Sequence, residues 1–312
     1  MIHIIHDIKR NSIHVYYSWF YSFHKQVTLL FMKIQQKLAI GFIRTKINIL
    51  RLISTRKAAE EAFRIFSTPM MRSAIKEKDV FMNGEQLEFS LDGILVKGFR
   101  CSHPQQKKIL LLHGFSSSAH NFYQYVAPLV EKNYEVLAFD APAHGASEGK
   151  EVNAVVYSEM IKKVIELYGP IDGFIGHSFG GIAISLAMET IPHDASTKIV
   201  FFAPATEKTN AVDGAFEMLG LKSNKVRKEF DKIVYEVSGK ETSWFSVRRA
   251  MNNIKASVLW VHDEDDDITP LRDALQVKED NHPNIRFTIT KGLGHRKIYR
   301  DEAVVDAVVK FL

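Results

Sequence analysis

Short runs of apolar residues recur along the last two thirds of the chain and predict the strands of a sheet. Helix-like segments, such as residues 152–167, separate most of these runs. Runs that are apolar throughout are typical of parallel strands, which are buried on both faces. The alternation of strand and helix therefore predicts an α/β fold, a doubly wound, mostly parallel sheet with helices on both faces. The predicted strands are residues 109–112, 136–139, 171–175, 199–202, 258–261 and 285–289.

A hairpin is predicted ahead of these strands. Residues 87–91 and 94–100 read as two short strands, and Asp92-Gly93 lies between them. An Asp-Gly pair in this position is a strong signal for a tight antiparallel turn. The sheet should therefore begin with an antiparallel hairpin and continue in parallel.

The interval between the strands that end near Ala203 and begin near Ser257 is unusually long. It holds roughly 50 residues of helical character, whereas a crossover between parallel strands needs only about a dozen. We expect the surplus, at about residues 207–254, to form a small helical cap. Phe216 and Trp244 of this segment are candidates for lining a substrate pocket, and the alternative is that they pack the cap onto the body.

The segment before the hairpin, residues 32–84, is expected to be a helical extension. A single helix is predicted over residues 33–66, because Ile40, Ile43, Ile47 and Leu50 recur at steps of three and four, and Ser67-Thr68-Pro69 should end it. Lys37, Arg44 and Arg51 lie seven apart on another face. Two interpretations remain open: a helix packed on its own domain with a solvated basic face, and a helix lying on an anionic membrane.

The first 31 residues are rich in aromatic side chains. Their uncharged run, residues 11–24, has 14 residues, short of the roughly 20 that a membrane-spanning helix needs. One interpretation is that translation begins at Met32 and that the aromatic-rich arm is not made. The other is an interfacial anchor, because Trp and Tyr suit the headgroup region of a bilayer.

Charge is distributed unevenly between the two parts of the chain. Residues 1–59 hold ten Lys or Arg and one acid, a balance of +9, whereas the remainder holds 31 basic and 35 acidic residues, a balance of −4. The acidic body argues against a nucleic-acid partner. The basic segment, residues 1–59, leaves peripheral membrane contact open.

The remaining composition sets broad limits. The 312 residues suffice for one large α/β domain plus an extension, and 46% hydrophobic with 25% charged residues is ordinary for a globular protein. Cys101 is the single cysteine, which excludes an intramolecular disulfide and a cysteine-based zinc site. We expect a cytoplasmic protein, with membrane association as the alternative, and neither a metal nor an organic cofactor.

The most informative motif is Gly176-His177-Ser178-Phe179-Gly180, followed at once by Gly181. A predicted strand enters it and a helix-like run, residues 182–189, leaves it. This is the context of a nucleophile elbow, in which a serine sits on a tight strand-to-helix turn. Glycines flank the serine because neighbouring Cβ atoms would collide with the strand and the helix.

A serine hydroxyl is a weak nucleophile and needs a base, an acid that orients the base, and donors for the oxyanion. The base candidate is His295, on a glycine-bearing loop after the last predicted strand. The acid candidate is Asp266, in an acidic run after the strand at residues 258–261, with Asp267 as its rival. The order Ser, Asp, His is the one that this kind of elbow accompanies.

Two backbone N–H groups are expected to form the oxyanion hole. One belongs to Phe179, directly after the serine, and the other to Phe115, in the loop His113-Gly114-Phe115 after the first parallel strand. His113 and His177, in the same two loops, are further candidates for lining a substrate pocket.

These pieces, in this order, resemble an α/β-hydrolase-fold serine hydrolase. The resemblance runs from about Leu87 to Leu312, within an expected catalytic domain of residues 85–312, and includes the loop at residues 140–147. Within the fold the chain is similar to the capped group with serine aminopeptidase-like and monoacylglycerol-lipase-like members. It departs from the family pattern at Asp263, where a glycine is common, and at residues 141–144, Ala-Pro-Ala-His, where relatives often have an arginine. His144 could reach the site, and a structural role is the alternative.

The resemblance implies a serine hydrolase that cleaves an ester, thioester or amide bond of a small molecule through an acyl-enzyme on Ser178. One alternative is a membrane-associated lipid esterase or an acyltransferase. Another is a member of the fold that binds a ligand without catalysis.

Overall fold

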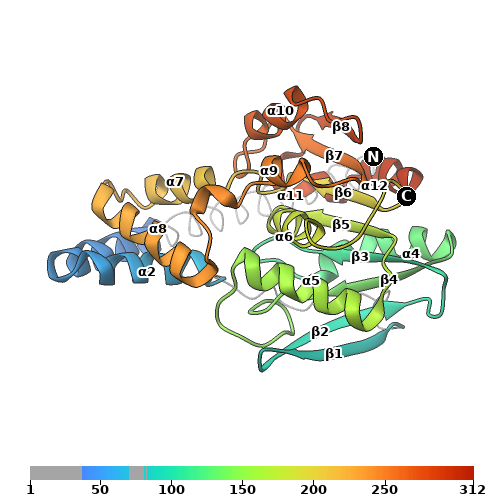
Figure 1. The fold of residues 1–312 in the computed structure, drawn as a ribbon, viewed down its shortest axis with the longest axis horizontal. Coiled ribbons are helices and arrows are strands. Elements are labelled where there is room, and N and C mark those ends of the chain that lie inside the picture. Colours follow the sequence, from blue (N-terminus) through green and yellow to red (C-terminus); the bar gives the residue numbers. More distant parts are fainter. Residues whose placement is uncertain (1–36, 70–80, 82) are drawn as a thin grey trace, which may run out of the picture.

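The computed structural model describes residues 37–69, 81 and 83–312 (Figure 1). The aromatic-rich arm, residues 1–31, and both interpretations of it lie outside the described residues. No described helix combines the length and the apolar character needed to cross a bilayer.

An eight-stranded sheet forms the centre of the molecule, in the order β1-β2-β4-β3-β5-β6-β7-β8. β1 and β2 form the antiparallel hairpin that leads the sheet, β2 pairs antiparallel with β4, and all later pairs are parallel. This topology confirms the predicted fold. The strands are β1 (Glu85–Leu91), β2 (Ile94–Cys101), β3 (Lys107–Leu112), β4 (Tyr134–Phe139), β5 (Gly173–His177), β6 (Lys198–Phe202), β7 (Ser257–Asp263) and β8 (Ile285–Thr290).

Helices cover both faces of the sheet, which explains why the strands are apolar throughout. Successive side chains of a strand point to opposite faces, and Leu110 and Leu112 of β3 belong to one core cluster while Ile109 and Leu111 belong to the other. α5 (Ala154–Tyr168), α6 (Phe179–Met188) and α10 (Leu271–Glu279) contribute to the first cluster, and α4 (Tyr123–Glu131) and α12 (Glu302–Phe311) to the second.

The insertion between β6 and β7 is helical, as expected. It forms α7 (Lys208–Met218), α8 (Asn224–Ser238), a short 3₁₀ turn (Thr242–Trp244) and α9 (Val247–Met251). Figure 1 shows α7 and α8 at the left, beside the blue helices of residues 37–67. We call α7 and α8, together with the helix of residues 37–53 and the helix of residues 55–67, the helical lobe.

The lobe joins two segments that are far apart in the sequence. The ring of Phe230, on α8, is buried with its centroid 5.7 Å from Phe63, 5.9 Å from Phe66 and 5.5 Å from Phe216. At the surface Arg56 forms two hydrogen bonds with the carboxylate of Glu236. The N-terminal extension is therefore packed on the insertion rather than on the sheet alone.

The prediction of a single helix over residues 33–66 is wrong at one point. The chain is helical over residues 37–53, breaks at Ser54, and resumes as α2 (Thr55–Ser67). Ser54 has extended backbone angles (φ −158°, ψ 126°), and its hydroxyl accepts a hydrogen bond from the N–H of Lys57 (3.3 Å). Serine favours this capping position because its oxygen satisfies an amide that the helix leaves unpaired. The predicted end near Ser67 is confirmed.

Candidate active site

Ser178 lies at the junction of β5 and α6, as the motif predicts. It is the N-cap residue of α6, and its backbone is strained (φ 51°, ψ −110°), since a positive φ brings Cβ close to the backbone. The neighbouring chain is tightly packed: a Cβ at Gly180 would lie 2.3 Å from the carbonyl oxygen of Leu112. The sequence thus folds into a turn that holds one hydroxyl at the amino end of a helix.

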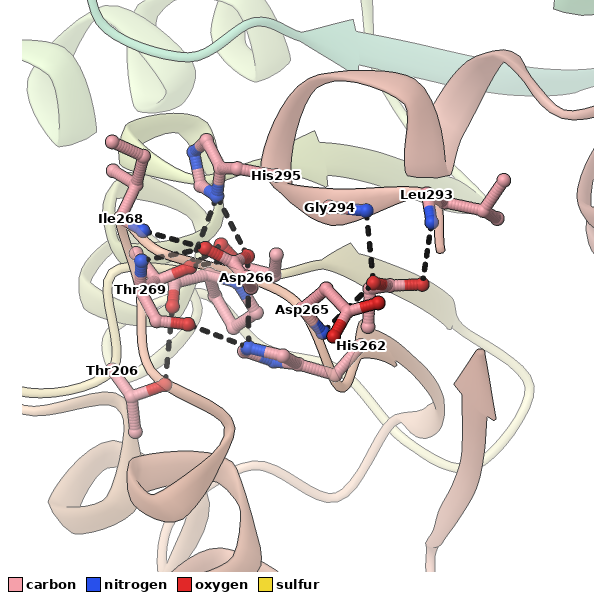
Figure 2. Close-up of polar contacts among 12 residues, drawn as sticks. Thr206, His262, Asp265, Asp266, Ile268, Thr269, Leu293, Gly294 and His295 are labelled. Carbon is pink, nitrogen blue, oxygen red and sulfur yellow. Dashed lines mark hydrogen bonds and ion pairs between the residues drawn. The ribbon is translucent and has the colours of Figure 1, made fainter. Parts of the chain in front are cut away.

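His295 and Asp266 meet at the carboxyl edge of the same sheet. His295 lies on α11 (Gly294–Lys297), after β8, and its Nδ1 is 2.8 Å from Oδ2 of Asp266 (Figure 2). Both side chains are buried. A carboxylate only accepts hydrogen bonds, so the proton of the neutral imidazole is on Nδ1. Nε2 of His295 is then free to act as an acceptor.

Asp266 is held as a carboxylate. Burial raises its pKa, but the hydrogen bond and charge interaction with His295, together with the amides of Thr269 and Ile268, outweigh burial and lower the pKa below its usual value. The rival acid, Asp267, is exposed. Of the two candidates that the sequence left open, Asp266 is therefore the one that contacts His295.

Asp263 ties the loop of Asp266 to the loop of His295. Its carboxylate is fully buried and accepts hydrogen bonds from the amides of Leu293 (3.1 Å), Gly294 (2.8 Å) and Asp265 (3.0 Å) and from the hydroxyl of Thr290 (2.7 Å). Leu293 and Gly294, whose amides donate to this carboxylate, are labelled in Figure 2. Sequence reasoning missed this role, although it noted Asp263 as a departure from the glycine usual there.

His177 connects the loop of Ser178 to the loop of His295. Its Nε2 donates to the backbone oxygen of His295 (2.9 Å), and its ring lies between those of His295 (4.6 Å) and Tyr299 (4.5 Å). Burial lowers the pKa of His177 to about 3, so the ring is neutral. The ring is buried between the two loops, and the expectation that His177 lines a substrate pocket stays a prediction.

The loop His113-Gly114-Phe115 passes directly against Ser178. A Cβ at Gly114 would lie 3.2 Å from Cβ of Ser178, and the ring of Phe115 packs edge-on against that of Phe179 (5.5 Å). Because Phe179 begins α6, its N–H lacks an intrahelical acceptor. The two amides predicted for an oxyanion hole therefore belong to adjoining loops.

Two buried histidines hold this loop in place. Nδ1 of His113 donates to the oxygen of Gly114 (2.8 Å), and its Nε2 accepts from the amide of Ala141 (2.9 Å). Burial lowers the pKa of His113 to about 4. Nε2 of His144 accepts from the amide of Ser116 (2.9 Å). Backbone groups thus occupy both ring nitrogens of His113, and its expected place in a substrate pocket stays a prediction. The contact of His144 with Ser116 fits the structural alternative.

The cap residues expected in the pocket pack against protein instead. Phe216 is buried with its ring edge-on to Phe230. The half-buried ring of Trp244 lies edge-on to Phe245 (5.2 Å), and the guanidinium of Arg249 covers it at 4.2 Å. These contacts favour the alternative, packing, and the pocket assignment of the two residues stays a prediction. Within the described part of the chain no group of three or more His, Cys, Asp or Glu could hold a metal ion.

Comparison with known proteins places this site in a family context. The model of the alpha/beta hydrolase family matches residues 109–307. An uncharacterized hydrolase of Bacillus subtilis, YugF, is 32% identical over 106 residues (32% of this chain, 38% of that protein). Polyneuridine aldehyde esterase of Rauvolfia serpentina is 30% identical over 118 residues (36% and 45%). The matched segments thus span less than half the length of these relatives.

Solved structures resemble the chain over a larger part. The Pyrococcus furiosus esterase Pf2001 has a TM-score of 0.60 at 19% identity, over 79% of this chain and 97% of that one. Est1E of Butyrivibrio proteoclasticus, solved with ferulic acid, has a TM-score of 0.58 at 20% identity, over 72% and 97%. At this level of identity the likeness concerns the fold alone.

Proposed function

The chain belongs to the alpha/beta hydrolase family, and from that premise we propose that it is a serine hydrolase acting on carboxylic esters. The observation that carries the proposal is the contact between His295 and Asp266 (2.8 Å), with the loop of His295 tied through His177 to the loop of the strained Ser178. These are the residue types, in the chain order, that acyl transfer on this fold requires.

The proposed reaction begins with attack of Ser178 Oγ on the ester carbonyl. Nε2 of His295 takes the hydroxyl proton, and Asp266 stabilises the resulting imidazolium. The amides of Phe115 and Phe179 donate to the oxyanion of the tetrahedral intermediate. His295 then gives the proton to the departing alcohol, which leaves an acyl-enzyme on Ser178. Attack of water, activated by His295, releases the carboxylic acid and restores the serine.

An ester is the preferred substrate class because the relatives include named esterases and solved structures of the same fold include esterases. Thioesters and amides share the same tetrahedral chemistry and are the nearest alternatives, and an alcohol in place of water would make the protein an acyltransferase. We further propose that the helical lobe is the cap that selects the substrate. Its connection begins at the elbow, where the N–H of Ala205 donates to the carbonyl of Ser178 (3.0 Å).

A fluorophosphonate probe tests the nucleophile. We expect one covalent adduct per chain, on Ser178, and a loss of labelling in Ser178→Ala. Hydrolysis of p-nitrophenyl acetate should fall by about 10⁴-fold or more in Ser178→Ala, as for removal of a triad serine elsewhere. A folded protein that fails to react with the probe, or a Ser178→Ala variant with unchanged activity, would overturn the proposal in favour of a binding protein of this fold.

The two neighbouring acids provide a matched pair for the orienting role. Asp266→Asn should lower kcat by about 10³- to 10⁴-fold, because the amide favours the wrong imidazole tautomer. Asp267→Asn makes the same chemical change on an exposed side chain and should leave kcat within about twofold. Equal losses in the two variants, measured with the same ester, would contradict the assignment of Asp266.

A further inference from the structure

The helix of residues 37–53 carries a row of large apolar side chains that face solvent. We call this row the outer stripe. The spacing of four, seven, three and one residues places its members on one face of a helix with 3.6 residues per turn. Its members, with their exposed fractions, are Leu38 (68%), Phe42 (72%), Ile49 (55%), Leu52 (82%) and Ile53 (71%).

The opposite face already supplies the packing that the helix needs. Ile47 is buried, and Ile40, Ile43 and Leu50 pack against the same core cluster. Nε of Arg44 also donates to the carbonyl of Leu219 at the end of α7 (2.6 Å). An amphipathic helix at a protein surface usually has a polar face towards water, so a second apolar face is unexpected. Contiguous exposed apolar surface of this kind marks an interaction site.

Charge indicates which partner this face would meet. Residues 37–53 contain Lys37, Arg44, Lys46 and Arg51 and no acid. Lys46 forms an ion pair with Glu61 (2.9 Å) on α2. By helical position, Lys46 borders the outer stripe on one side, and Lys37, Arg44 and Arg51 lie on the other side, between the stripe and the buried face. Long basic side chains beside an apolar stripe can extend to anionic headgroups while the stripe enters the acyl region.

The same charges disfavour two other partners for the outer stripe, a second copy of the chain and the preceding residues of this chain. A second copy of the helix would bring like charges together across a symmetric contact. The preceding 36 residues are also net basic, with four Lys or Arg and one acid. We propose that the outer stripe docks the protein on an anionic lipid bilayer. The proposal concerns binding alone and is independent of the chemistry at Ser178.

Vesicle co-sedimentation of the full chain tests this docking. Wild-type protein should sediment with vesicles of equimolar phosphatidylcholine and phosphatidylglycerol, and much less with phosphatidylcholine alone. Phe42→Gln combined with Leu52→Gln should weaken binding roughly 100-fold or more, since two large side chains no longer leave water. The matched control, Leu167→Gln with Leu275→Gln, changes two exposed apolar side chains on α5 and α10 and should bind like wild type.

The basic residues contribute separately. Lys37→Gln combined with Arg51→Gln should weaken binding roughly 30-fold at low salt, from about 1 kcal/mol for each charge near an anionic surface. The matched control is Lys278→Gln with Lys310→Gln, exposed positions on α10 and α12. All variants should keep the wild-type thermal midpoint and the wild-type rate on a water-soluble ester.

Three outcomes would overturn the docking proposal. The first is folded wild-type protein that stays in the supernatant with anionic vesicles. The second is undiminished binding by the Phe42→Gln, Leu52→Gln variant. The third is a dimer, detected by light scattering, that this variant disperses, which would assign the outer stripe to a subunit contact. Ser178→Ala should bind vesicles like wild type, so a failure of the proposed chemistry and a failure of docking are distinguishable.

Discussion

At the scale of single residues, Asp263 and two buried histidines hold the loops on which the proposed catalytic groups lie. Asp263 joins the loops of Asp266 and His295 through four hydrogen bonds to its carboxylate. His177 and His113 use ring nitrogens to bind backbone groups of the neighbouring loops. These residues would act by positioning, since a displacement of about 1 Å can cost about 100-fold in rate.

Asp263→Asn should impair both activity and stability. One acceptor oxygen becomes an NH₂ group facing backbone N–H donors, so we expect kcat to fall about 10- to 100-fold with a smaller change in KM. The thermal midpoint at pH 7 should fall by roughly 5–10 °C. Glu264→Gln, the same kind of change on an exposed side chain of this loop, is the control and should change neither quantity.

The difference in stability between wild type and Asp263→Asn should depend on pH in a defined direction. Burial raises the pKa of Asp263, but hydrogen bonds from Thr290, Gly294, Asp265 and Leu293 outweigh it and lower the pKa below its usual value. The stabilisation is therefore complete above about pH 4, the ordinary pKa of aspartate, and is lost as the pH falls through the lower native pKa. A gap between the midpoints of wild type and Asp263→Asn that persists unchanged at pH 2–3 would contradict this origin.

At the scale of elements, the helical lobe depends on a contact between α2 and α8. Most strands of the sheet lie between these two helices along the chain. Phe230 lies at the centre of this contact, and three other phenylalanine rings surround it. Burial of aromatic side chains dominates such contacts. The N-terminal helices should therefore leave the body when this ring is removed.

Phe230→Ala should cost about 3–5 kcal/mol, the usual range for a buried phenylalanine. We expect limited trypsin digestion to cut within residues 37–67 at least tenfold faster than in wild type, since this segment holds several Lys and Arg. Tyr235→Ala truncates an exposed ring on the same helix and should digest at the wild-type rate. Equal protection of both variants would show that the lobe is held by other contacts.

The elements also show what the sequence could and could not predict. Strand positions were predicted well because both faces of the sheet are buried, although β5 runs to His177 rather than ending at Ile175. The helix break at Ser54 was missed because serine is tolerated both inside helices and at their caps. The outer stripe was also missed: residues 37–53 are apolar on two faces, and only tertiary packing decides which face is buried.

At the scale of the whole molecule, burial favours the neutral form of several histidines in the folded protein. Burial lowers the pKa of His113 to about 4 and of His177 to about 3, and it also lowers the pKa values of His120 and His262. In the unfolded chain these rings accept protons near pH 6.5. Between pH 6.5 and 4 the unfolded state therefore binds more protons than the native state, so stability falls as the pH is lowered.

The free energy of unfolding should drop by a few kcal/mol between pH 7 and pH 5, because each such histidine contributes up to about 2 kcal/mol over this interval. Urea titrations at the two values, followed by fluorescence, measure the change. The urea midpoint should recover fully on return to pH 7. A midpoint that is constant over this range would contradict the neutral burial of His113 and His177.

The strained backbone at Ser178 has a consequence for how the sequence can change over time. Glycine would adopt the positive φ there at little cost, and the turn is the kind of position where it gains stability over other residues. Stability alone would therefore favour replacing the serine. Lineages that lost the need for its hydroxyl should therefore drift towards glycine at 178.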